Sequence, residues 1–163
     1  MNSVKSSAID GLPIYAECGG LIYLCKSLKW KDNRYEMTGL FPIELVMNIK
    51  PVGHGYSEME IDTENPFFAI GEIINGHEFH YSGITGDSVE FTTAAKMNTG
   101  TGLGNLRDGL IFNNAIGFYT HIHAGGNKVW AGSMIKAALK FHNKRGEPTG
   151  NFSMSHGRKT IAA

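Results

Sequence analysis

A cysteine followed by two glycines offers the most direct chemistry in this sequence. Cys18 comes after the apolar run 14–16, which predicts a buried strand, and before apolar residues at helical spacing, namely Leu21, Cys25 and Leu28. Gly19 and Gly20 remove the Cβ clashes of a tight strand-to-helix turn. A thiol at such a turn faces unpaired N–H groups, which favour the thiolate. Cys18 is therefore predicted to be a nucleophile on an elbow, by analogy with the Gly-x-Ser-x-Gly turn. The alternative is a buried structural cysteine.

Two histidines are the candidates for the base that such a nucleophile requires. His121 and His123 stand at the end of a predicted strand, before Gly125-Gly126 and a helix, where the active sites of open α/β sheets lie. Strand alternation predicts that both lie on one face. One of them could take the Cys18 proton while another group orients its ring. The alternatives are two half-exposed strand histidines, or a zinc site formed by His121, His123 and Cys18.

A second histidine-rich stretch, GHEFHYS at residues 76–82, superficially resembles a zinc-protease motif. That motif needs histidines at i and i+4 on a helix. Here His77 and His80 are three apart, in a segment predicted to be strand and turn. The sequence therefore favours polar binding or structural hydrogen bonding for this stretch, and no metal.

These side chains must be positioned by a sheet with helices near both ends of the chain. Alternating patterns predict strands at 57–61 and 89–93, and hairpins are predicted around Asn75-Gly76 and Asn113-Asn114. An amphipathic helix begins near Trp130, with Asn127 as its N-cap and Gly146 after its end. The fold class is therefore α/β, with a mixed sheet that is mostly antiparallel in its middle. Residues 1–146 form one domain, and 147–163 are expected to be a flexible polar tail.

Composition excludes several classes of function. The chain has 163 residues, 42% of them hydrophobic, a formal net charge of zero and a pI near 7.1. This balance gives no electrostatic case for nucleic acid or an anionic membrane surface, and no apolar run is long enough to span a bilayer. The N-terminus lacks a secretory signal, and two cysteines do not make a disulfide framework. A cytoplasmic protein is expected.

The sequence resembles the glutaminase domain of the cobyrinic acid a,c-diamide synthase family. The resemblance is carried by five stretches, GLPIYAECGGLIYL, GLFPIEL, GHGYSEMEI, GHEFHYS and FYTHIHAGGN. It implies a flavodoxin-like domain of the class I, or triad-type, glutamine amidotransferases. Complete members join this domain to an ATP-using synthetase domain and amidate two acetate carboxylates of a corrin-type macrocycle. Close relatives act on sirohydrochlorin-type substrates, such as nickel sirohydrochlorin.

The resemblance also implies a role for each candidate residue. Cys18 would attack the glutamine amide and form a glutamyl thioester, with His121 as the base. Gly19 N–H, beside Gly20, would donate to the oxyanion. The third triad position, two residues after the histidine, holds His123 in place of the usual acid. The residues that match GHEFHYS would line the site; these are His77, His80 and Tyr81.

The resemblance further implies that this chain is the C-terminal part of a glutaminase domain. In the family, roughly half of the sheet and a glycine-rich loop with a second oxyanion donor precede the strand that begins here near Pro13. The synthetase domain, with its ATP, Mg²⁺ and tetrapyrrole acid, also lies outside this sequence, so no cofactor or metal is expected in the chain itself. We expect it to form a homo-oligomer or to bind a partner that supplies the missing half. The alternative is an inactive module that binds a partner protein or a tetrapyrrole.

Overall fold

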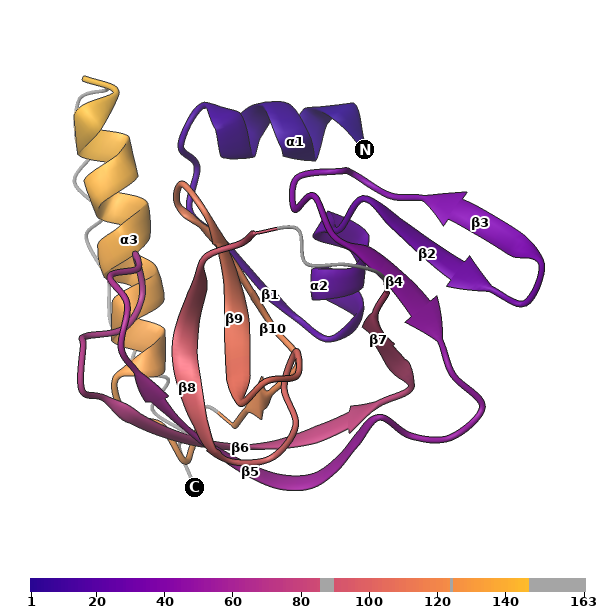
Figure 1. Ribbon diagram of the computed structural model, residues 1–163. Helices are drawn as coiled ribbons and strands as arrows, with labels where there is room; N and C mark the ends of the chain where they lie inside the picture. The colour runs from indigo at the N-terminus through magenta and orange to yellow at the C-terminus, as the bar shows by residue number, and fades with distance from the viewer. Residues whose placement is uncertain (86–89, 124, 147–163) are drawn as a thin grey trace, which may run out of the picture.

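The structure, a computed structural model, describes residues 1–85, 90–123 and 125–146. In these ranges two sheets and three helices form a layered α/β fold (Figure 1). The helices are α1 (Asn2–Ile9), α2 (Gly19–Leu24) and α3 (Trp130–Lys144). The larger sheet has the order β1 (Ile14–Glu17), β10 (Ala115–Phe118), β9 (Arg107–Phe112), β8 (Thr93–Thr99), β5 (Gly53–Ile61), β6 (Ile73–His80) and β11 (His121–Ile122). The smaller has the order β3 (Asn33–Glu36), β2 (Ser27–Trp30), β4 (Glu44–Met47) and β7 (Ser82–Ile84).

The larger sheet is mixed, as predicted. Strands β1 and β10 run parallel, with Ile14 opposite Ala115 and Glu17 opposite Phe118, and the remaining described neighbours in this sheet are antiparallel. The carboxyl ends of β1 and β10 therefore lie side by side. Both the predicted nucleophile and the predicted base follow those ends in the sequence.

Each face of the larger sheet is covered by a different set of elements (Figure 1). On one face, Trp130, Met134 and Ala137 of α3 pack in a core that contains Ile116 and Phe118 of β10. On the other, α2 and the smaller sheet share a second core, with Leu21 and Leu45 fully buried. Burial on both faces holds β1 and β10 rigidly, and with them the residues that follow.

The predicted C-terminal helix is confirmed, and so is the glycine that follows its end. The N-cap position is Val129 and not the predicted Asn127; the Asn127 side-chain oxygen accepts the backbone N–H groups of Val129 (3.1 Å) and Trp130 (2.9 Å) in the turn just before the helix. Gly146 follows the helix with φ +69°, a conformation that glycine adopts without a Cβ penalty. In the described ranges no helix is both long and apolar enough to cross a membrane.

The predicted helix after Cys18 is shorter than its apolar spacing indicates. α2 ends at Leu24, and Leu28 lies in β2. The carbonyl of Leu24 accepts the Phe41 N–H (2.9 Å), and Lys26 donates to the Ile43 carbonyl (2.9 Å). These contacts with a later segment draw the chain into the smaller sheet, so tertiary pairing overrides the local helical pattern.

The predicted hairpin at Asn75-Gly76 is wrong, because both residues lie inside β6. Gly76 pairs with Ser57 on one side and with Ile122 on the other. A Cβ at Gly76 would clash with the His121 carbonyl oxygen. This glycine therefore marks a close approach between strands rather than a turn.

The remaining predictions have mixed outcomes. The hairpin at Asn113-Asn114 is confirmed by β9 and β10, which pair antiparallel. In the predicted strand at 89–93, Val89 lies outside the described residues and β8 begins only at Thr93. The predicted tail at 147–163 also lies outside the described residues.

Candidate active site

Cys18 occupies a strained turn between β1 and α2, as the nucleophile elbow predicts. Its backbone has φ 43° and ψ −99°, a combination that non-glycine residues rarely adopt. Its N–H donates to the Phe118 carbonyl (2.8 Å), and its own carbonyl accepts the Ile22 N–H (2.9 Å). A Cβ on Gly20 would lie 3.1 Å from that of Ala16, so the turn is also closely packed. Strand β10 and helix α2 together hold this conformation.

The Cys18 thiol differs from the sequence expectation in its protonation. Burial raises the pKa of this half-buried thiol; the Gly19 N–H lowers it, the Glu17 charge raises it further, and the net direction is upward. The expected thiolate is thus not favoured, because desolvation outweighs the N–H groups of a six-residue helix. A nucleophilic Cys18 requires a base to take its proton.

His121 lies at the edge of the larger sheet, held between two side chains. In β11 it pairs with His77 of β6, and the two rings stack with centroids 5.0 Å apart and an interplanar angle of 16°. The His121 Nδ1 lies 3.5 Å from the Glu17 Oε2. The other Glu17 oxygen accepts hydrogen bonds from the Ile122 N–H (3.1 Å) and the Tyr15 hydroxyl (2.7 Å).

Glu17 thus links the turn that carries Cys18 to the predicted base, His121. Cys18 follows Glu17 directly, and His121 contacts the Glu17 side chain. Among the described residues, no hydrogen bond joins the Cys18 thiol to the His121 ring. Catalytic hydrogen bonds are often long in enzymes without substrate and tighten when substrate binds.

His123 is placed differently from the sequence expectation. β11 ends at Ile122, so His123 lies beyond the strand, with its side chain exposed. Its carbonyl accepts the N–H groups of Gly126 (2.8 Å) and Asn127 (3.1 Å) in the turn toward α3. Within the described ranges, no hydrogen bond, ion pair or ring contact joins His123 to His121, whose acidic neighbour is Glu17.

The zinc alternative lacks a set of ligands. In the part of the chain that the structure describes, no three His, Cys, Asp or Glu side chains are grouped so that they could hold a metal ion. The proposed set of Cys18, His121 and His123 is therefore not brought together.

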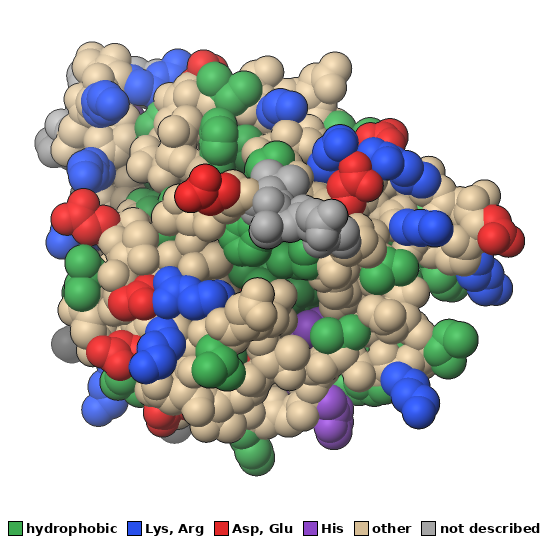
Figure 2. Space-filling model, viewed as in Figure 1, with side chains coloured by type: hydrophobic (Ala, Val, Ile, Leu, Met, Phe, Trp, Pro, Cys, Tyr) green, Lys and Arg blue, Asp and Glu red, His purple; other side chains and the backbone are tan. Residues whose placement is uncertain are grey.

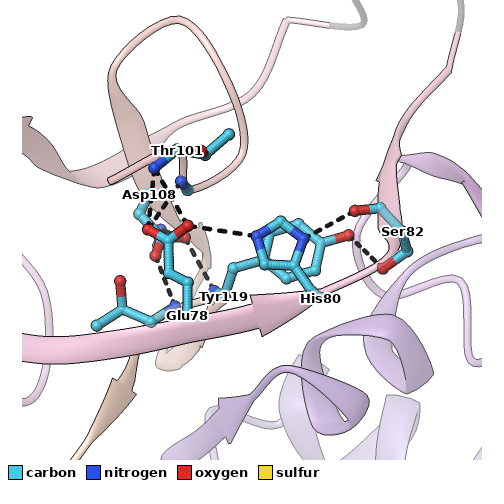
Figure 3. Close-up of polar contacts among 9 residues, drawn as sticks. Glu78, His80, Ser82, Thr101, Asp108 and Tyr119 are labelled. Atoms are coloured by element: carbon cyan, nitrogen blue, oxygen red, sulfur yellow. Dashed lines mark hydrogen bonds and ion pairs between the residues drawn. The ribbon is translucent and has the colours of Figure 1, made fainter. Parts of the chain in front are cut away.

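The GHEFHYS stretch divides between two faces of the sheet. His77, Phe79 and Tyr81 are exposed, and the Phe79 ring contacts those of Tyr81 (5.5 Å) and His54 (5.4 Å) edge to face. Glu78 and His80 point inward and are buried (Figure 3). Of the two histidines in this stretch, His77 lies at the predicted site, where its ring stacks on that of His121. His80 is buried on the other face of the sheet, away from His121.

His80 belongs to a buried polar network (Figure 3). Its ring stacks on that of Tyr119 at 3.7 Å, its Nδ1 lies 2.9 Å from the Ser82 carbonyl, and its Nε2 lies 3.5 Å from Glu78. Glu78 also accepts the N–H groups of Thr101 (3.1 Å) and Gly102 (3.0 Å). Burial alone would raise the pKa of Glu78, but the nearby His80 ring and the hydrogen bonds from the Gly102 and Thr101 N–H groups bring it below its usual value.

A buried aspartate shapes the turn that leads to His121. Asp108 is fully buried and accepts the N–H groups of Gly109 (2.8 Å), Tyr119 (3.0 Å) and Thr120 (2.9 Å). Desolvation raises its pKa, against the effect of these N–H groups. Neither Asp108 nor Glu17 is among the residues that the sequence predicts for the site. The only sequence feature that could have indicated a role for Glu17 or Asp108 is a single acidic residue next to an apolar strand segment.

A cavity of about 470 Å³ lies elsewhere, lined by residues that include Phe41, Phe91 and Leu110. Figure 2 shows a hollow with an apolar floor on this face of the molecule. Phe112, which also lines the cavity, pairs with Ala115 at the amino end of β10, the end opposite Cys18. None of the predicted site residues lines this cavity.

Curated relatives share the sequence over most of this chain. Cobyrinate a,c-diamide synthase of Magnetococcus marinus is 37% identical over 133 residues, which are 80% of this chain and 28% of that protein. The synthase of the same name from Archaeoglobus fulgidus is 35% identical over 141 residues, 85% of this chain and 30% of that protein. The chain thus spans less than a third of the length of these relatives.

Solved structures share the fold. PurLQS from Thermotoga maritima matches with a TM-score of 0.58 and 16% identity, over 85% of this chain and 66% of that one. A Thermoplasma acidophilum protein assigned to GMP synthase matches with a TM-score of 0.56 and 19% identity, over 89% of this chain and 67% of that one. The model of the CobB/CobQ-like glutamine amidotransferase domain matches residues 1–129. The chain belongs to the family of CobB/CobQ-like glutamine amidotransferase domains.

Proposed function

We propose that this chain hydrolyses glutamine through a Cys18 thioester, as the glutaminase portion of an a,c-diamide synthase. The observation that carries the proposal is the strained Cys18 elbow, whose preceding residue Glu17 contacts a histidine, His121, that also stacks on His77. Family membership and the names of the relatives agree with this chemistry.

The proposed reaction has two halves. His121 takes the Cys18 proton, and the thiolate attacks the side-chain amide carbon of glutamine. The Gly19 N–H donates to the resulting oxyanion; loss of such a donor typically lowers the rate by about 10²–10³. The tetrahedral intermediate collapses, the protonated His121 gives its proton to the leaving nitrogen, and ammonia departs. Water, deprotonated by His121, then hydrolyses the thioester to glutamate and frees Cys18.

The ammonia acceptor in this proposal lies in a separate synthetase portion. With ATP and Mg²⁺, that portion would convert a carboxylate of cobyrinic acid, or of a sirohydrochlorin-type acid, to an acyl phosphate that ammonia attacks.

An aromatic face on β5 and β6 beside His121 would contact this synthetase portion. It consists of His54 and Tyr56 of β5, His77 and Phe79 of β6, and Tyr81, which directly follows β6, with Tyr56 90% and Phe79 52% exposed. Both cysteines are free thiols, which suits the reducing cytoplasm in which we propose that the protein acts.

Labelling with a glutamine-mimicking diazoketone tests the glutaminase proposal. The wild type and the His121→Ala variant are treated, and the adducts are located by intact mass and peptide mapping. We expect an adduct on Cys18, formed much more slowly in His121→Ala, with Cys25 unlabelled as the internal control. If Cys18 and Cys25 both stay unlabelled, the chain is an inactive module and the proposal is wrong.

A further inference from the structure

We infer that Glu17 is the positioning residue of the His121 base, in the role that other triad-type enzymes give to an acid two places after the histidine. This inference rests on the proposed glutamine hydrolysis. It assigns the third position to the residue immediately before the nucleophile, so that a single strand end, that of β1, supplies both Glu17 and Cys18.

The two oxygens of the Glu17 carboxylate have separate partners. The Oε1 atom accepts hydrogen bonds from the Ile122 N–H and the Tyr15 hydroxyl, at 3.1 and 2.7 Å. These bonds come from β11 and β1, so they fix the carboxylate between the two strands. The Oε2 atom lies 3.5 Å from the Nδ1 of His121. The Glu17 and His121 side chains are 23% and 32% exposed, so their contact is partly shielded from water.

This arrangement selects one tautomer of the imidazole. A carboxylate beside Nδ1 favours the form that carries the proton there, which leaves Nε2 as the acceptor. The His77 ring stacks on the imidazole and restricts its plane from the other strand. A neutral His121 is thereby prepared to accept the thiol proton at Nε2, and the negative charge of Glu17 stabilises the imidazolium that forms.

The alternative residue for this position has no comparable contact. His123 stands two places after His121 in the sequence, but its side chain is exposed and lies beyond the end of β11. Its described hydrogen bonds are those of its backbone carbonyl in the next turn. A histidine at that place also could not supply the fixed negative charge that the imidazolium requires.

Glu17→Gln is the informative substitution. The amide has one oxygen, and the Ile122 N–H and the Tyr15 hydroxyl both require an acceptor, so the NH₂ group turns toward His121. The imidazole must then accept at Nδ1 and carry its proton on Nε2, where it blocks proton transfer from the thiol. Tyr15→Phe is the matched control, because it removes one hydrogen bond to the same carboxylate and leaves the charge in place.

The experiment combines two measurements on the intact chain. Nitrogen-15 NMR of labelled histidines reports which ring nitrogen of His121 carries the proton, with His123 as the internal reference. The second-order rate of Cys18 labelling by the diazoketone reports the reactivity of the site. We expect an Nδ1–H tautomer in the wild type and in Tyr15→Phe, and an Nε2–H tautomer in Glu17→Gln. We expect Glu17→Gln to slow labelling by about 100-fold or more, as loss of a general base does.

The outcomes separate this inference from the proposed function. If the wild type labels and Glu17→Gln labels equally fast with an unchanged tautomer, Glu17 has no positioning role, while the glutaminase proposal stands. If the wild type does not label at all, the glutaminase proposal fails. The tautomers then still decide whether Glu17 sets the protonation of His121. A Glu17→Asp variant that restores the Nδ1–H tautomer supports the role of the charge over that of side-chain shape.

Discussion

Cys18 and Cys25 are seven positions apart, yet their thiols have different environments. Cys18 is half-buried, while Cys25 is fully buried and burial raises its pKa to about 12. Both thiols are therefore mostly protonated at neutral pH. Reactivity at Cys18 must come from a nearby base and from bound substrate rather than from an intrinsically acidic thiol.

This difference predicts the pH dependence of alkylation. Because the pKa of Cys18 is raised, its reaction with iodoacetamide should keep increasing above the ordinary thiol pKa of about 8.5. Cys25 should remain unmodified over the same range. The rates can be followed by peptide mass spectrometry. A profile for Cys18 that levels off near neutral pH would indicate a preformed thiolate and contradict this assignment.

Glu78 predicts a second pH effect, on stability. Its pKa is lowered in the folded protein, so its stabilising contribution is present above about pH 4.3 and is lost as the pH falls through the folded pKa. Glu78→Gln should lower the free energy of unfolding by about 1–3 kcal/mol at pH 7, because buried donors lose a charged acceptor. The variant should also show a flatter decline toward acid pH.

Urea unfolding at several pH values measures both effects of Glu78→Gln. The exposed Glu64 provides the control, since Glu64→Gln should leave both the stability and its pH dependence nearly unchanged. Parallel acid profiles for the wild type and Glu78→Gln would show that this carboxylate does not contribute as described.

Among the elements, those with strong local signals were predictable. The strand before Cys18, the tight turn and the position of α3 follow from apolar spacing and glycine placement. The length of α2 could not be predicted in this way, because hydrogen bonds with the backbone of Phe41 and Ile43 decide where the helix ends. The Glu17–His121 contact joins residues far apart in the chain, and no local pattern could indicate it.

Gly76 is the glycine on which the position of β11 depends. A Cβ there would clash with the His121 carbonyl oxygen and with the Thr120 side chain. We expect Gly76→Ala to displace β11, to lower the free energy of unfolding by about 1–3 kcal/mol and to slow Cys18 labelling. Gly132→Ala in α3 is the matched control, with no atom within 4 Å, and should stabilise the protein by about 0.5 kcal/mol.

Chemical denaturation and the labelling assay together test this glycine pair. The expected pattern is a loss of both stability and labelling in Gly76→Ala, with labelling unchanged in Gly132→Ala. Normal labelling in Gly76→Ala would show that His121 can reach Cys18 without the close β6–β11 approach, contrary to the geometry described.

For the molecule as a whole, the clearest consequence comes from β1, whose second edge pairs with no other described strand. Strand β1 pairs with β10 and is the first strand in the order of the larger sheet. The N–H groups of Ile14 and Cys18 are bonded toward β10, so those of Tyr15 and Glu17 point to the open edge. An unpaired edge of this kind is a template for another strand.

We predict that the purified chain self-associates through this edge. Sedimentation should show a dimer whose proportion grows with concentration, and hydrogen exchange should show slow amides at Tyr15 and Glu17 under the same conditions. A monomer with fast exchange at both amides would contradict the prediction.

Trapping the covalent intermediate tests the central claim most directly. The chain is mixed with glutamine, quenched in acid and analysed by intact mass and peptide mapping, with Cys18→Ala and Cys25→Ala as controls. We expect an adduct on Cys18 with the mass of glutamine less ammonia, present in Cys25→Ala and absent in Cys18→Ala. Glutamate release without an adduct that depends on Cys18, or neither adduct nor glutamate, would contradict a thioester mechanism at this elbow.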